Sequence, residues 1–525
     1  MVVNLTKNLS ATLLALLVPA LFFCSPTQAD QSIALAWNPS PSPGVVGYVV
    51  YYGTDGSNFN NEIDAGSNTF ATLTGLQPGT TNRFEVVAYS TNGVESPPSN
   101  LIEYSVPGTP VTAKTILVQS NASTDITLLI SGQGTLAQNL TGKVFQAGKQ
   151  YTLTAAPAKG MVFAGWVSSG VVVSTKPNYT FVLGSNAVLQ ANFVTNPFIP
   201  VEGTYRGLCY VPNDAAAESS GSFLVTVTSS GAFSARLCLA GVDHAYGGEF
   251  SLTGAAFKSI PRAGLSPITV QLQLDLSNGP MTGTISDGTW TAQLVANPAI
   301  YSRTNHAPQA GRYTLLIPGM DNAPTQPGGN GFGAVTVNTL GDVSLSGTLG
   351  DGTPFASSSV VASQGQWPFY VSIYGGKGCI LGWLSFTNNG DVSGEINWFK
   401  LPEETAKLYP GGFTNGTEAI GSIYQYTNGM PVLGFTDGLL SLLNGDLAES
   451  ITNQAGIGPE LPATEPYTTK LSVSTSTGMF HGSVINPATG KPISVRGIVL
   501  QNQNLGAGYF LGTNQCGSVL LSASP

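Results

Sequence analysis

The chain has 525 residues, of which 42% are hydrophobic and only 9% are charged, and its net charge is −9. It contains no cluster of Lys and Arg that could hold a phosphate backbone, so we expect no nucleic-acid partner. Hydrophobic residues alternate regularly with polar ones, so the high content of Gly and Pro, 64 and 34 residues, does not indicate disorder. The length predicts about three to four domains.

Residues 1–29 predict a secretory signal peptide. Lys7 precedes an apolar run over 11–23, and Thr27-Gln28-Ala29 offers small residues for cleavage. A lipoprotein acylated on Cys24 is the less favoured alternative, because bulky residues precede that cysteine. No later stretch reaches the roughly 20 apolar residues of a membrane-spanning helix. We therefore expect a protein that is secreted or lies at the cell surface, without a transmembrane segment in the mature chain.

Four cysteines remain after the leader is removed, and an even number in an oxidising compartment predicts two disulfides. Three connectivities are open. Two of the four lie in adjacent strand-like runs, which favours that pair and leaves the other two as the second bond. Four buried thiols are the alternative. The favoured pairs are Cys209 with Cys238 and Cys379 with Cys516.

The first predicted domain spans residues 31–107. It contains Trp37 on a strand-like run, a Gly-Tyr-Val-Val-Tyr-Tyr-Gly strand over 47–53, and a Leu-x-Pro-Gly-Thr corner that begins at Leu76. Together these motifs resemble a fibronectin type III domain, which implies a β-sandwich that spaces, displays or binds. Members of that family usually carry a Tyr six residues after the corner Leu, but Asn82 stands here. The corner hydrogen bond is therefore lost or replaced.

A second predicted domain covers residues 111–195. It contains a Leu-Thr-Ala-Ala-Pro strand within 150–157, a Phe-Ala-Gly-Trp strand within 160–166, and an Ala-Asn-Phe ending within 186–193. This order is similar to the internalin-type B repeat, a small β module of bacterial surface proteins. The resemblance implies a compact all-β module in which the tryptophan fills a small core.

Residues 201–525 resemble no family that we recognise, but they contain an internal repeat. Three motifs recur at nearly constant offsets of 108, 110 and 111 residues, which indicates duplication. We predict β domains at 201–310 and 311–425, followed by a C-terminal β region at 426–525. A weaker match at an offset of 88 indicates a partial third copy there. The matched segments are 203–205 with 311–313, 225–227 with 335–337, 279–283 with 390–394, and 478–482 as the weaker copy.

Alternating apolar and polar residues predict antiparallel strands throughout the repeats. Ile268 to Leu276 is the clearest run, and Gly-rich turns such as 277–280 separate the strands. Only 402–409 has helical character. The predicted fold class is all-β: a fibronectin type III sandwich, a small β repeat module, then duplicated antiparallel β barrels or sandwiches.

No motif indicates a cofactor, a metal or a catalytic centre. The three histidines lack metal-ligand spacing to one another or to cysteine. An Asp-His pair at 243–244 has no accompanying nucleophile elbow and is read as a polar loop pair. An acidic loop over 55–64 does not follow the order of a calcium-binding loop. Glu403-Glu404 is read as the start of the short helix. The other residues considered are His306, His481, Glu249, Glu395 and Glu418.

Aromatic residues of the C-terminal region give the strongest indication of binding, since exposed rings stack on sugars. Neighbouring rings on one strand point to opposite faces, so at least one of each set is expected in the core. The candidate ligand-binding aromatics are Trp367, Tyr370, Tyr374, Trp383 and Trp398.

These observations predict an extracytoplasmic, non-enzymatic protein that acts in adhesion or binds carbohydrate or protein. One alternative is a glycoside hydrolase of unfamiliar β architecture, which would need two carboxylates facing each other across a cleft. A less favoured alternative is an outer-membrane β-barrel, which would need longer strands with aromatic girdles.

Overall fold

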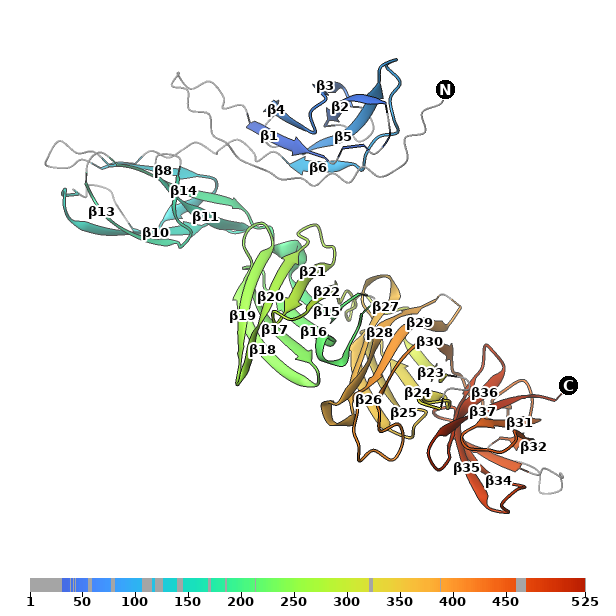
Figure 1. Ribbon diagram of the computed structural model, residues 1–525. Coiled ribbons are helices and arrows are strands. Elements are labelled where there is room, and N and C mark those ends of the chain that lie inside the picture. Colours follow the sequence, from blue (N-terminus) through green and yellow to red (C-terminus); the bar gives the residue numbers. More distant parts are fainter. Residues whose placement is uncertain are drawn as a thin grey trace. The chain divides into compact units, whose positions relative to one another are not determined.

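The fold was analysed in a computed structural model that forms two compact units, which divide between Thr195 and Asn196 (Figure 1). The predicted signal peptide, and Asp55 and Asn58 of the loop considered for calcium, lie outside the described residues. No helix in the described part is long and apolar enough to cross a membrane. The structure describes residues 31–37, 39–40, 42, 44–54, 59–76, 81–105, 116–118, 126–138, 145–168, 171–184, 187–212, 214–320, 324–387, 389–458 and 469–524.

The fibronectin-like part of the first unit is a two-sheet sandwich. Its core places Trp37 against Tyr48 with ring centroids 5.7 Å apart, and Phe84 is buried beside them. Asn82, which replaces the usual tyrosine, is also buried. One sheet pairs β1 (Gln31–Ala36) with β4 (Phe70–Leu76), and the other has the order β3 (Asn61–Gly66), β2 (Val45–Gly53), β5 (Thr81–Ser90), β6 (Ile102–Ser105).

The second part of this unit surrounds Trp166, which is fully buried and donates its indole N–H to the carbonyl of Pro177 at 3.0 Å. The sequence therefore placed the core tryptophan correctly. One pair, β8 with β14, is parallel. The sheets are β13 (Asn178–Val182), β10 (Gln150–Pro157), β9 (Gly134–Leu136), and β12 (Val171–Ser174), β11 (Met161–Ser168), β14 (Ala187–Thr195), β8 (Ile126–Ser131), β7 (Ile116–Val118).

The second unit begins with an eight-stranded antiparallel meander, here called barrel 1. Its first strand pairs with its last, so the sheet curls into a nearly closed barrel whose seam lies between β18 and β19. Inward residues such as Val225, Leu237 and Val270 fill its core. The strands are β15 (Gly203–Tyr210), β16 (Gly221–Val227), β17 (Ala232–Leu239), β18 (Val242–Glu249), β19 (Ala255–Arg262), β20 (Leu265–Leu274), β21 (Met281–Ser286) and β22 (Thr291–Pro298).

Barrel 2 repeats this order strand for strand. Each barrel also carries the same local bond: Tyr205 donates to the carbonyl of Val201 at 2.9 Å, and Tyr313 donates to that of Gln309 at 2.8 Å. Both tyrosines lie within the repeated motifs of the sequence. The strands are β23 (Gly311–Ile317), β24 (Gly331–Val337), β25 (Asp342–Thr348), β26 (Pro354–Val360), β27 (Gln366–Ile373), β28 (Gly378–Phe386), β29 (Asp391–Lys400) and β30 (Phe413–Ile423).

Barrel 3 is a closed barrel with seven strands among the described residues. Its β32 and β33 are parallel, unlike any neighbouring pair in barrels 1 and 2. In barrel 1, β16 and β18 both run antiparallel to β17 and therefore run parallel to each other. A meander that lacked the strand between two such neighbours would pair two parallel strands, as β32 and β33 pair in barrel 3. The strands are β31 (Asp437–Asn444), β32 (Ile451–Ile457), β33 (Thr469–Val473), β34 (Met479–Ile485), β35 (Pro492–Leu500), β36 (Leu505–Leu511) and β37 (Cys516–Ala523).

The predicted all-β fold class is confirmed, but the helix predicted over 402–409 is wrong. Glu403 N–H donates to the carbonyl of Pro410 at 2.7 Å, which closes a loop in place of a helical turn. The Glu403 carboxylate pairs with Lys377 instead of capping a helix. The helices that the structure does describe are single 3₁₀ turns: η1 (Ile199–Val201), η2 (Ala217–Ser219), η3 (Ser363–Gly365) and η4 (Tyr374–Gly376).

Candidate functional site

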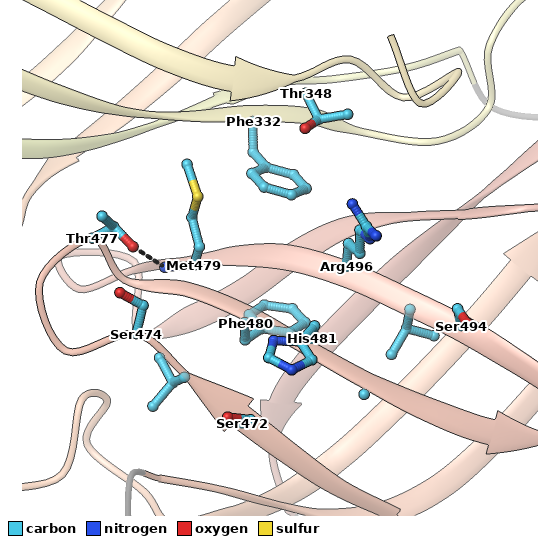
Figure 2. A pocket seen from close by; sticks show the side chains of 13 residues that line it. Phe332, Thr348, Ser472, Ser474, Thr477, Met479, Phe480, His481, Ser494 and Arg496 are labelled. Carbon is cyan, nitrogen blue, oxygen red and sulfur yellow. Dashed lines mark hydrogen bonds between the residues drawn. The ribbon is translucent and has the colours of Figure 1, made fainter. Parts of the chain in front are cut away.

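The larger described cavity lies between barrel 2 and barrel 3 and has a volume of about 600 Å³. Figure 2 shows Phe332 and Thr348 projecting from barrel 2 toward the strands that carry Met479 and Arg496. Barrel 3 supplies the remaining walls from the end of β33, the following turn, β34 and β35. These remaining residues are Ser472, Val473, Ser474, Thr477, Phe480, His481, Gly482, Ser494 and Val495.

Strand alternation decides which side chains of β34 and β35 reach the cavity. Phe480 and Val495 are buried in the core of barrel 3, so their neighbours His481 and Arg496 project from the outer face. His481 and Arg496 are also register partners across the two strands. The pairing therefore places an imidazole beside a guanidinium on the wall of the cavity.

A tight turn joins β33 to β34 at one end of the cavity. The Gly478 N–H donates to the Ser474 carbonyl at 2.8 Å, and Gly478 has a φ of +71°. Glycine suits this position because a side chain there would be strained. The Thr477 hydroxyl accepts from the Met479 N–H at 3.4 Å, as drawn in Figure 2. This turn fixes the hydroxyls of Ser474 and Thr477 relative to the strand.

An apolar contact between the two barrels supports the cavity. Phe332 of β24 stacks on Tyr509 of β36 with centroids 5.9 Å apart, and both rings are almost fully buried. Leu316, Ile498 and Leu500 belong to the same cluster. This buried apolar contact stabilises the packing of barrel 2 against barrel 3, and the two barrels supply the two sides of the cavity.

The wall of the cavity carries one permanently charged side chain, the guanidinium of Arg496. Arg496 and His481 carry the ionisable side chains among its thirteen lining residues, and none of these is Asp or Glu. Burial raises the pKa of the neighbouring Tyr509, while Arg496 and a hydrogen bond with Thr348 act in the opposite direction. The cavity thus presents a cationic guanidinium in a chain whose net charge is −9.

A smaller cavity of about 300 Å³ lies between residues 324–328 and barrel 3. Cys516 lines it, and the Tyr409 hydroxyl lies 3.2 Å from its sulfur. Asp446, also in the wall, accepts hydrogen bonds from the N–H groups of Asn514 and Gln515. Burial raises the pKa of Cys516, which disfavours the nucleophilic thiolate. We therefore assign this cavity no chemistry.

The two predicted disulfides are not formed, and all four cysteines are free thiols. Gly221 is the register partner of both Cys209 and Leu239, so Cys209 points into barrel 1 with Leu239. Cys238, next to Leu239, points to the opposite face of the sheet. Cys379 lies on the outer face of barrel 2 beside Phe399, where it is buried against Ala217 of barrel 1, whereas Cys516 belongs to a separate core cluster.

The five candidate ligand-binding aromatics do not form an exposed platform. Trp367 and Trp398 are fully buried in the core of barrel 2, so the binding role predicted for them is wrong. Tyr374 packs against the same core. Tyr370 is half-buried, and its hydroxyl accepts from the Gly241 N–H of barrel 1 at 3.3 Å. Trp383 is half-buried on β28, outside the two cavities.

One pair of the singly considered carboxylates is brought together. Glu395 of β29 and Glu418 of β30 are register partners, and both side chains are exposed. They lie outside the two described cavities. Glu249 lies opposite Ala232 on the edge of barrel 1.

The Asp-His pair lies on β18, so its expected place in a loop is wrong. Asp243 pairs with Arg236, which is the main reason that the pKa of its carboxyl is lowered. His244 is the next residue of the same strand, and burial lowers its pKa. His306 is exposed. The described residues contain no group of three or more His, Cys, Asp or Glu that could hold a metal ion.

Sequence reasoning missed the cavity because its two ionisable residues are fifteen positions apart and met only through strand register. Alternation predicts that His481 points outward and is exposed, which is correct, but Arg496 was not singled out. Alternation along β34 and β35 would have placed both on the outer face. The contribution of Phe332 and Thr348 from barrel 2 had no signal in the sequence.

Two family models match the N-terminal part of the chain. Residues 19–105 match the Fibronectin type III domain, and residues 125–197 match the Divergent InlB B-repeat domain. Both resemblances inferred from the sequence are thereby confirmed. The C-terminal region matches no family model. Modules of these two kinds are typical of extracellular or surface proteins, and the chain is accordingly a multidomain β protein of that class.

Similarity to individual proteins is limited. A stretch of 84 residues is 40% identical to the Kelch domain-containing protein SSO1033 of Saccharolobus solfataricus, and covers 15% of this chain and 11% of that protein. Fibronectin domains FN1-FN3 of chicken CNTN1 align at 12% identity over 60% of this chain and 91% of theirs, with a TM-score of 0.14. The central fibronectin-III array of RIM-binding protein aligns at 12% identity over 55% and 98%, with a TM-score of 0.13. Scores this low support no argument about the fold.

Proposed function

We propose that the chain is a secreted or surface-attached bacterial protein with a non-catalytic role in adhesion, and that its C-terminal unit binds carbohydrate. The N-terminal modules act as spacers, and the cavity between barrels 2 and 3 receives the ligand. A protein ligand is the second candidate, because fibronectin modules are often used to bind proteins.

The observation that carries this proposal is the composition of the cavity wall. Hydroxyl side chains line it on several sides, and hydroxyls both donate and accept hydrogen bonds, as sugar hydroxyls do. Phe332 and Met479 add apolar surface. A cavity of about 600 Å³ falls in the range of small-ligand sites. The hydroxyl-bearing residues are Thr348, Ser472, Ser474, Thr477 and Ser494.

The composition of the wall also favours binding over hydrolysis. Glycoside hydrolysis requires a carboxylic acid and a carboxylate on either side of the scissile bond, and the thirteen lining residues include neither. A ligand bound in this cavity would contact hydroxyl and other hydrogen-bonding side chains, but no lining pair of carboxyl groups that could act as general acid and base.

The test is a glycan array probed with the mature chain, followed by a hydrolysis assay on each saccharide that binds. Ser494→Trp fills the cavity and is expected to abolish binding. Ser234→Trp, an exposed strand position on barrel 1, is the matched control and should bind normally. Turnover of a bound saccharide, or equal binding by both variants, contradicts the proposal.

A further inference from the structure

The guanidinium of Arg496 is the strongest recognition group in the cavity. Arg83, Arg236 and Arg262 each pair with a carboxylate, whereas no ion pair among the described residues involves Arg496. Its neighbours are the Tyr509 hydroxyl on β36 and the His481 imidazole on β34. A planar guanidinium in this position can still make two parallel hydrogen bonds to an oxyanion.

His481 lies directly across from Arg496 on the same face of the sheet. Register partners of an antiparallel pair have Cβ atoms about 4.5 to 5.5 Å apart, so one anionic group can contact both side chains. The remaining lining residues are uncharged, and no Asp or Glu among them competes for these donors. The charge of the cavity is therefore complementary to an anion.

The surroundings of the two groups distinguish a saccharide from other anions. Ser472 lies opposite His481 on β33, Ser494 lies two residues before Arg496 on β35, and Thr348 faces them from barrel 2. A free inorganic anion would use only the Arg496 guanidinium and the His481 imidazole. An acidic peptide would present main-chain groups to a barrel whose strands around the cavity are already paired with each other. A sugar acid matches both the charge and the hydroxyl-lined walls.

We infer that the ligand of this cavity is a carboxylate-bearing saccharide of the uronic acid class, whose carboxylate is bound by Arg496 beside His481. This inference rests on the proposed carbohydrate-binding function and specifies the class of sugar. Met479 and Phe332 then contact the less polar face of the ring, and the serine and threonine hydroxyls bind its hydroxyl groups.

The experiment compares trigalacturonate with its fully methyl-esterified form by isothermal titration calorimetry on the mature chain. Losing a hydrogen bond to a charged group costs about 1.5 to 3 kcal/mol, so the ester and Arg496→Gln are each expected to weaken binding at least tenfold. Arg312→Gln, an exposed arginine outside the cavity, is the matched control and should bind trigalacturonate normally. Unchanged thermal unfolding of both variants establishes that they fold.

The outcomes separate this inference from the function on which it rests. Equal binding of the acid and the ester, blocked by Ser494→Trp, overturns the inference and leaves carbohydrate binding intact. Failure of every saccharide to bind overturns both. Binding of an oligo-aspartate peptide in place of trigalacturonate, lost in Arg496→Gln, replaces the saccharide by an acidic peptide and also overturns the inference.

Discussion

The hydroxyl of Tyr374 donates a 2.7 Å hydrogen bond to the carboxylate of Asp351. Tyr374 has a φ of +54°, a conformation that is unfavourable for a tyrosine, so tertiary contacts must hold it. The Trp398 indole N–H donates to the same hydroxyl at 3.2 Å, and the Lys400 ammonium lies 5.1 Å from the centre of the tyrosine ring. This network fixes one end of barrel 2.

Tyr374→Phe is predicted to destabilise the C-terminal unit by about 1 to 3 kcal/mol, because it removes the hydrogen bond to Asp351 Oδ2 and leaves the Trp398 N–H without its partner. Urea unfolding followed by tryptophan fluorescence measures the change. Tyr426→Phe is the control, since no described hydrogen bond involves that hydroxyl, and it should change stability by less than about 0.5 kcal/mol. Similar effects of the two substitutions would refute the importance of the network.

Buried thiols predict a loss of stability at alkaline pH. Burial raises the pKa of Cys209 and of Cys379 to about 12. In the unfolded chain a thiol titrates near pH 8.5. Between about pH 8.5 and 12 these two thiols are therefore ionised in the unfolded chain but still protonated in the folded protein. The stability from each thiol is complete below about pH 8.5 and is lost as the pH rises toward 12, by about 1.4 kcal/mol per pH unit.

The measurement is the free energy of unfolding from pH 7.5 to 9, below the ordinary tyrosine pKa of about 10. Cys209→Ala should reduce the slope above about pH 8.5, whatever its effect on stability at neutral pH. An unchanged slope would show that this thiol does not have a raised pKa in the folded protein.

Closure of barrel 1 depends on a close approach between its first and last strands. A Cβ added at Gly207 would lie 1.9 Å from the Val295 carbonyl oxygen and 2.5 Å from the Ala296 Cα. Both are backbone atoms, so the strands would have to separate. Gly207→Ala is predicted to cost about 1 to 3 kcal/mol or more.

Gly411→Ala is the matched control, because a Cβ there meets no atom within 4 Å and the glycine has an ordinary φ. Thermal unfolding of both variants compares them. If Gly207→Ala unfolds at the temperature of Gly411→Ala, the close packing of β15 on β22 is incorrect.

The facing carboxylates Glu395 and Glu418 predict a stabilising substitution. Like charges directly opposite each other on a sheet are unfavourable, so Glu395→Lys should stabilise barrel 2 by about 0.2 to 1 kcal/mol at low salt. The gain should shrink in 1 M salt, where the screening length is about 3 Å. Glu249→Lys, opposite Ala232, should give no such salt-dependent gain. Chemical denaturation at two salt concentrations distinguishes them.

The sequence predicted the β class and the two N-terminal modules because their signals are local. Trp37 and Trp166 stand within short motifs, and alternation of apolar residues such as Val270 and Leu272 marks the inward face of a strand. The repeated motifs around Tyr205 and Tyr313 likewise led to two meanders with the same strand order.

Long-range register explains what the sequence did not reveal. Whether the Trp398 ring faces the core or the solvent depends on which face of β29 points inward. Trp398 has an aromatic neighbour on the same strand that points to the opposite face, so the sequence alone does not decide which of the two rings faces the barrel core. The carboxylates of Glu395 and Glu418 met only through pairing of β29 with β30. His481 and Arg496 also meet only through strand pairing. The weaker repeat match of 478–482 to 390–394 does not align the two barrels strand for strand, because it relates the fourth strand from the end of barrel 3 to the second-last strand of barrel 2.

The seam of barrel 1 bears on how the folded chain avoids self-association. Main-chain groups on β18 and β19 are not used by a neighbouring strand there, and such edges recruit strands from other molecules. Charged side chains stand on both edges, with Asp243 and Glu249 on one and Lys258 and Arg262 on the other. Aggregation of a destabilised chain should therefore begin at this gap once those charges are neutralised, whereas the closed ring of barrel 3 offers no comparable edge among its described strands.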